Sequence, residues 1–286
     1  MQMLQLVRLS RLFAALLSSA VIATLSWNPA AGHELWIEAP SAGEVNQTCK
    51  LEVCWGHSGE RASGRSLEGQ QDKISLQVIQ PDGTRSELKP VLATDCFTAE
   101  VAPSKPGCYV VGGELQTGII TRQVHSIPPN TRIIMYGKTV TRVGNGEGGF
   151  DGVVGHDLEI VLLTPPDKLK PGAVAKAKLL FQGKPLGGRD VELTLSTAGS
   201  QAPAEDPQIQ SSLWSTAAAP HPKTGEVAFP LIVGGRHFFS VHYVDETAGT
   251  YTGDRNDNSD FSHLRKGDAF ERTMYMVTLT VQVNED

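Results

Sequence analysis

The sequence predicts an all-β protein made of two β-sandwich domains of the immunoglobulin-like or transthyretin-like kind. Several short segments alternate apolar and polar residues with a period of two, as half-buried strands do. Turns rich in glycine and proline separate these segments, as in an antiparallel sandwich. Beyond residue 32 there is no convincing amphipathic helix, so we expect little helix.

Three segments show the alternation most clearly. Residues 74–80 (ISLQVIQ) lead into a Pro-Asp-Gly turn, and residues 191–197 (VELTLST) repeat the pattern. Residues 277–283 (VTLTVQV) set four aliphatic side chains against threonines and a glutamine. Each segment predicts a strand with one apolar face.

A glycine-rich stretch at residues 143–155 (VGNGEGGFDGVVG) is typical of a linker or a long loop. We place the domain boundary there. The prediction is then a signal peptide at 1–32, a cysteine-containing sandwich at 33–145 and a cysteine-free sandwich at 146–286. Two polar stretches, 196–212 and 245–268, interrupt the second domain, and the sequence assigns no role to residues 246–268.

The first residues predict export. Arg8 and Arg11 precede an apolar run, residues 12–25, that is short for a membrane span. Ala30 and Gly32 are small, as a signal peptidase requires, so cleavage would make His33 the first residue of a periplasmic protein. The alternative is an uncleaved N-terminal anchor.

The net charge and the cysteine content limit which partners and which cross-links we expect. The net charge is −6, and removal of the two arginines of the leader makes it 23 − 31 = −8, which argues against nucleic acid as a partner. After cleavage we expect no direct insertion into a membrane. The four cysteines predict two disulfides in an exported protein, with three connectivities open and an all-cysteine zinc site as the alternative: Cys49, Cys54, Cys96 and Cys108.

Four blocks of sequence resemble the DUF4198 family: AGHELWIEAP, GHDLEIVLLTPPDKLKPG, AKLLFQGKPLGG and GEVAFPL followed by GRHFFSVHYVDE. Members of this family are described as periplasmic components of nickel or cobalt uptake systems. The resemblance implies a periplasmic two-domain β protein with an N-terminal histidine. It also implies a membrane transporter component as a partner.

Histidines supply the expected chemistry, because imidazole is a common ligand of nickel, cobalt, copper and zinc. A free amine and the ring of His33 would chelate a metal together. His156 and His242 are expected near strand ends, and Asp245 follows His242 closely enough to bind the metal or to orient the ring. The sequence therefore predicts one divalent transition-metal ion, nickel or cobalt with copper or zinc as alternatives, held by these four residues.

Three functions compete. The first is nickel or cobalt binding for uptake, the second is periplasmic copper binding through the same histidine, and the third is a structural or adhesive module without metal. We expect no enzymatic activity, because the sequence holds no G-x-S-x-G, H-E-x-x-H or phosphate-loop motif. A copper ion on the terminal histidine could support oxidative chemistry, which makes an oxidase the alternative.

Overall fold

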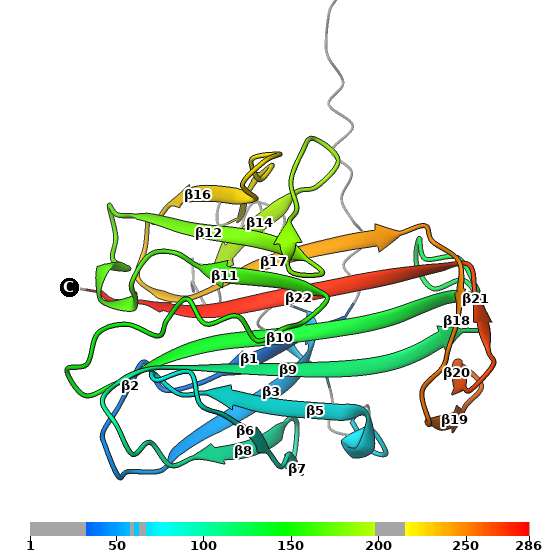
Figure 1. Cartoon of the computed structure of the whole chain (residues 1–286), viewed down its shortest axis with the longest axis horizontal. Helices are drawn as coiled ribbons and strands as arrows, with labels where there is room; N and C mark the ends of the chain where they lie inside the picture. Colours follow the sequence, from blue (N-terminus) through cyan, green and yellow to red (C-terminus); the bar gives the residue numbers. More distant parts are fainter. Residues whose placement is uncertain (1–32, 58–59, 63–66, 198–214, 286) are drawn as a thin grey trace, which may run out of the picture. The chain divides into compact units, whose positions relative to one another are not determined.

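Strands dominate the computed structural model, which describes residues 33–57, 60–62, 67–197 and 215–285 (Figure 1). The all-β prediction is confirmed, since the described residues form only two short 3-10 turns, η2 (Gln71–Lys73) and η3 (Pro166–Lys168). The predicted signal peptide, residues 1–32, lies outside the described residues. None of the helical turns in the described ranges is long and apolar enough to span a membrane.

One long sheet of eleven strands organises the described residues, which belong to one compact unit. Its central strands β10 and β22 pair in parallel, and the neighbouring pairs β9–β10 and β17–β22 are antiparallel. The order along the main path is β15-β14-β17-β22-β10-β9-β20-β19, with β2 beside β10 and the β5–β6 pair beside β9. The bounds are β2 Ala42–Gly43, β5 Ile74–Ile79, β6 Arg85–Leu88, β9 Gly107–Ile120, β10 Thr131–Val143, β14 Leu193–Thr197, β15 Ser215–Ala218, β17 Gly235–Asp245, β19 Asn256–Asn258, β20 Ser262–Arg265 and β22 Arg272–Val283.

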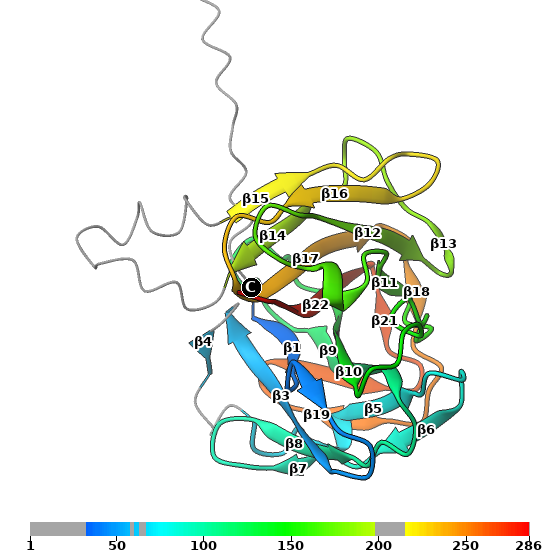
Figure 2. The same ribbon diagram turned by 90° about the vertical axis from the view of Figure 1, so that its left-hand side faces the viewer.

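Smaller sheets cover both faces of the long sheet (Figure 2). On one side lies a four-stranded sheet of β11 (Leu158–Leu162), β12 (Val174–Phe181), β13 (Lys184–Pro185) and β16 (Glu226–Pro230). On the other lies a five-stranded sheet of β1 (Glu34–Glu38), β3 (Cys49–His57), β4 (Glu60–Arg61), β7 (Val91–Leu92) and β8 (Phe97–Val101). A two-stranded sheet pairs β18 (Gly249–Thr250) with β21 (Ala269–Phe270).

Two hydrophobic cores follow from this layering, one on each face of the long sheet. The upper core joins the long sheet to the four-stranded sheet, and the lower core joins it to the five-stranded sheet. The predicted apolar face of residues 277–283 packs into the upper core. Thr278 and Thr280 on the other face are buried too, because that face is also covered.

Strand β1 runs unusually close to the long sheet. A Cβ atom at Gly137 in β10 would lie 3.2 Å from both the Ile37 Cγ1 atom and the Leu35 carbonyl oxygen. A side chain at this position would therefore push β1 away. The missing side chain is what lets the first described strand pack directly against β10.

The glycine-rich stretch expected as a linker is an ordered loop. Arg85 donates to the carbonyl oxygens of Val153 (2.5 Å) and Val154 (2.7 Å). A Cβ atom at Gly146 would lie 2.3 Å from the Gly107 nitrogen, so the loop backbone packs directly on the start of β9. The long sheet takes strands from both sides of residue 145. The division into two sandwich domains, 33–145 and 146–286, stays a prediction.

The polar stretch 245–268 contains strands that the sequence analysis did not predict. Strands β19 and β20 pair as a hairpin, and β20 extends the long sheet next to β9. Their sequences, NDN and SHLR, lack a clear apolar alternation. Backbone pairing at the sheet edge, together with burial of Leu264 against Ile119 and Tyr251, orders this part of the chain.

All four cysteines are free and buried in the structure, so the two predicted disulfides are not formed. Cys49 and Cys54 face opposite sides of β3, as the parity of their positions predicted. Cys54 and Cys96 share a small cluster with Trp36 and Phe238. Cys108 belongs to the upper core, on the far face of the long sheet.

Candidate metal centre

The start of the described chain is held by a row of three side-chain contacts between β1 and β17. Glu38 forms an ion pair with Arg236, with 2.7 Å between Oε2 and Nη1. The rings of Trp36 and Phe238 meet edge to face at 6.1 Å. At the end of the row the Nε2 atom of His242 lies 3.1 Å from the Glu34 Oε1 atom. This row fixes where β1 begins relative to β17.

Glu34 and His242 form a partly buried histidine–carboxylate pair. The side chains are 11% and 18% exposed, so a small ion or water can reach them while most of the contact is shielded. A carboxylate on one ring nitrogen sets the ring's orientation and leaves the other nitrogen available as a ligand. The pair can therefore take part in metal binding, with Glu34 as a ligand or as the orienting group.

His33 immediately precedes this pair in the chain. Its ring is exposed and packs against the Trp55 ring with 4.1 Å between centroids, on the side of β1 opposite the Glu34 side chain. If a peptidase removed residue 32, rotation about a single backbone torsion would swing the free amine and the ring together.

Asp245 lies at the end of β17, three residues beyond His242. Its Oδ1 atom accepts a hydrogen bond from the Thr247 N–H at 3.0 Å, which caps the strand end. Asp245 has the parity of Tyr243, whose side chain packs against the upper core. Asp245 is therefore close to His242 in the sequence, but its side chain does not lie on the face of β17 that contacts Glu34.

His156 lies on the opposite face of the long sheet from His242. Its ring stacks on Tyr136 of the upper core with 4.4 Å between centroids. His242 instead pairs with Met276, whose side chain belongs to the lower core. The sheet therefore separates the two histidines that were expected to share one metal ion.

Burial controls the protonation of His156. The residue is 7% exposed, and burial lowers the pKa of the ring to about 4. Its Nδ1 atom has no hydrogen-bond partner among the described residues. The ring is therefore neutral at ordinary pH and is held chiefly by stacking on Tyr136.

A buried ion pair lies next to His156. The Lys138 Nζ atom donates to Glu159 Oε1 at 2.5 Å and to the Gly152 carbonyl oxygen at 2.8 Å, and both side chains are at most 1% exposed. Burial lowers the pKa of Lys138, although Glu159 opposes the shift. Glu159 also accepts the backbone N–H groups of Val154 and Gly155. The two charged side chains therefore hold the backbone of the glycine-rich loop in place.

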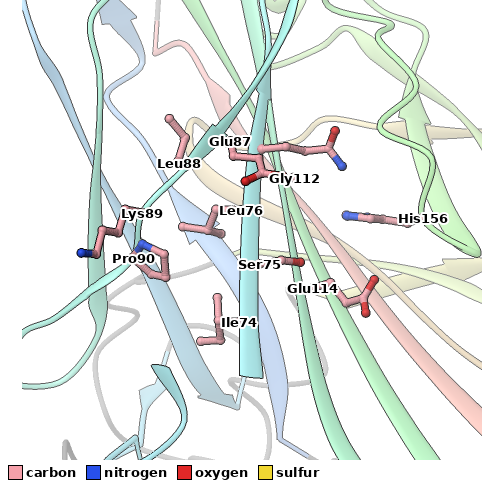
Figure 3. A pocket seen from close by; sticks show the side chains of 11 residues that line it. Ile74, Ser75, Leu76, Glu87, Leu88, Lys89, Pro90, Gly112, Glu114 and His156 are labelled. Carbon is pink, nitrogen blue, oxygen red and sulfur yellow. The ribbon is translucent and has the colours of Figure 1, made fainter. Parts of the chain in front are cut away.

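His156 also borders an open pocket of about 570 Å³. Figure 3 shows the His156 ring pointing toward strand β5, with Glu114 on its side of the pocket and Lys89 on the other. Glu87 adds a second carboxylate to the lining. A neutral imidazole beside these groups can accept or donate one hydrogen bond to a bound molecule.

The predicted site residues thus separate into two places. Within the described ranges, no group of three or more His, Cys, Asp or Glu side chains is arranged to hold a metal ion. The structure brings His242 to Glu34, beside His33, and leaves His156 on the other face. Sequence analysis missed Glu34. Its position directly after a terminal histidine was a signal, but its partner lies 208 residues away.

Two further histidines have local ring contacts. His237 faces the side of β17 opposite His242, as predicted, and its ring lies 3.1 Å from the Gly235 carbonyl oxygen. The His263 ring contacts the Asp268 carboxylate at 2.5 Å. The His57 side chain lies outside the described residues.

Comparison with protein families agrees with the resemblance seen in the sequence. A family model described as a domain of unknown function, DUF4198, matches residues 30–245. The chain belongs to the DUF4198 family. The matched range begins before His33 and ends just after His242, so both partners of the histidine–carboxylate pair lie within the family domain. No curated protein matches the chain.

Proposed function

We propose that this DUF4198 protein is a periplasmic binding protein for one divalent transition-metal ion, nickel or cobalt, and serves a metal uptake system. The observation that carries the proposal is the Glu34–His242 pair at the start of β1, next to His33. Export and removal of residues 1–32 would add the terminal amine of His33. The ion would then have the amine and ring of His33 and the ring of His242 as nitrogen ligands.

Glu34 completes this proposed site in one of two ways. It can bind the ion directly through a carboxylate oxygen, or it can hold the His242 ring through one nitrogen while the other binds the ion. Both arrangements need no thiolate and suit nickel, cobalt or copper. His156 and Asp245 lie outside this ligand set. The proposed membrane partner is a transporter component that receives the ion.

The test is a metal titration of the chain that begins at His33. Nickel, cobalt, copper and zinc are added separately and binding is followed by calorimetry. A matched chain with one extra residue before His33 keeps the ring but moves the amine away, so it should bind at least about tenfold more weakly, as loss of a ligand predicts. Acid should weaken binding in both chains, because the ligands must be deprotonated.

Each outcome assigns a function. A site of nitrogen ligands without a special geometry binds copper more tightly than nickel or cobalt. Tighter binding of nickel or cobalt than of copper would therefore support the uptake function. Clear preference for copper supports the periplasmic copper-binding alternative. If neither chain binds any of the four ions, the structural-module alternative replaces the proposal.

A further inference from the structure

The small buried cluster behind the β1–β17 row contains two of the four cysteines. Cys54 in β3 pairs with Trp36 of β1, and both are fully buried. Cys96 precedes β8 and is 2% exposed. Phe238 of β17 closes the cluster. The two thiols therefore lie on one face of the five-stranded sheet, shielded from solvent.

The strand register places these two cysteines opposite each other. Strands β3 and β8 are antiparallel, and the last pair of their ladder is Val53 with Phe97. The next residue of β3 is Cys54 and the residue just before β8 is Cys96, so continuing the ladder by one step sets the two opposite each other, and both belong to one buried cluster. Opposed residues in such a ladder have Cα atoms about 4.5–5.5 Å apart, which lies within the about 4.4–6.8 Å range of disulfides.

The other two cysteines have no comparable partner. Cys49 lies on β3 but has the parity of Leu51 and Val53, which face the lower core. Cys108 faces the upper core. The long sheet lies between Cys49 and Cys108, and β3 itself separates Cys49 from Cys54. Only one of the connectivities open at the level of sequence therefore contains a bond that the fold can accommodate.

We propose that Cys54 and Cys96 form a disulfide when the protein folds in an oxidising compartment, and that Cys49 and Cys108 remain thiols. The oxidant is an external disulfide. One cysteine thiolate attacks it to form a mixed disulfide, and the second displaces the remaining external thiol. The two protein thiols lose two electrons and two protons, and the external disulfide is reduced to two thiols.

The timing of this reaction follows from burial. Desolvation raises the pKa of both Cys54 and Cys96, so neither thiol is a ready nucleophile in the folded protein. Exchange must occur before Trp36 and Phe238 close over the pair. The disulfide would link β3 to β8 next to Trp36, whose ring contacts Phe238 and helps to hold β1 in place. It would stabilise the strand that carries Glu34, and it does not depend on metal binding.

The experiment directs the chain from His33 onward into a bacterial periplasm behind a leader peptide of established function. Purified protein is denatured without reductant, alkylated and mapped by peptide mass spectrometry. We expect two of the four cysteines, Cys49 and Cys108, to be alkylated, and one linked peptide pair joining Cys54 to Cys96. The leader makes this result independent of whether residues 1–32 direct export.

Two variants serve as matched controls. Cys49→Ala should retain the linked pair and lose one alkylated site. Cys54→Ala should lose the linked pair and show three alkylated cysteines. Should Cys54→Ala fail to fold, the native and Cys49→Ala maps still decide. Alkylation of all four cysteines in the native protein, or any linked peptide that contains Cys49 or Cys108, would overturn the proposal.

Discussion

His156 and His242 lie on opposite faces of the long sheet and differ in what surrounds their rings. His156 stacks on Tyr136 beside the buried Lys138–Glu159 pair, and burial holds its pKa at about 4. His242 contacts the Glu34 carboxylate at a partly exposed position. The His156 ring packs in the upper core, and the His242 ring is partly exposed on β17 beside the start of β1.

This difference separates structural from ligand-binding chemistry. Lys138 and Glu159 beside His156 pair with each other and with the backbone of the loop, so removing one leaves the other buried without its opposite charge. The contact at His242 uses only one ring nitrogen. We therefore propose that His156 has a structural role and that His242 is the metal ligand. The predictions below test this division.

The largest expected effect is on the buried ion pair. Lys138→Met should lower the free energy of unfolding by about 3–5 kcal/mol, because Glu159 is left charged and buried. Urea denaturation measures this change. Adding Glu159→Gln should recover a large part of the loss, since the remaining amide oxygen can still accept a backbone N–H.

The exposed pair Asp167–Lys168 provides the matched control. Lys168→Met removes the same charge from a solvated surface and should change stability by at most about 1 kcal/mol. Equal losses in the free energy of unfolding for Lys138→Met and Lys168→Met would show that the buried pair beside His156 stabilises the fold no more than an exposed pair does.

The second effect is the pH dependence of stability at His156. The folded pKa of about 4 lies below the ordinary value of 6.5, so the unfolded state takes up the proton first as the pH falls. The contribution is complete above pH 6.5, decreases between pH 6.5 and 4, and amounts to about 3 kcal/mol at one pKa unit per 1.36 kcal/mol. His156→Asn should flatten this part of the profile in thermal or urea unfolding. An unchanged slope would contradict the assignment.

Local features of the fold could be predicted from the sequence because they depend on residue parity. The strands around Ile74 and Val277 follow from period-two alternation, and the opposed directions of Cys49 and Cys54 follow from the same rule. Short-range spacing also predicted that His237 and His242 face opposite ways.

Long-range features could not be predicted in this way. Nothing in the sequence pairs Glu34 with His242, and nothing says which face of the long sheet His156 meets. The glycine-rich loop looked like a linker because Arg85, which holds Val153 and Val154, is distant from them in sequence. The fourteen-residue strand β9 is nearly all buried, so it lacks the alternation by which shorter strands are recognised.

The third prediction compares metal affinities at the two histidines. Glu34→Gln should weaken binding by about 10–100-fold, as loss of a group that orients or supports a ligand does. His242→Ala should weaken it at least as much. His156→Asn should leave the affinity unchanged, because the sheet lies between it and the proposed site. Calorimetry with nickel measures all three affinities. A larger loss of affinity in His156→Asn than in His242→Ala would show that His156, and not His242, is the metal ligand.

The smallest expected effect is at Asp245. Its carboxylate accepts the Thr247 N–H, a role that asparagine can keep through its amide oxygen. Asp245→Asn should therefore change nickel affinity by less than about twofold, the scale of an ordinary surface substitution. A tenfold loss would place Asp245 among the ligands.

The most direct test is anomalous X-ray diffraction from crystals of the chain that begins at His33, grown with nickel. We expect one strong anomalous peak at the start of β1, at about 2.1 Å from nitrogen atoms of His33 and His242 and close to Glu34. A peak beside His156, in the pocket that this residue borders, would contradict the proposal. So would a fully loaded crystal with no peak near either histidine.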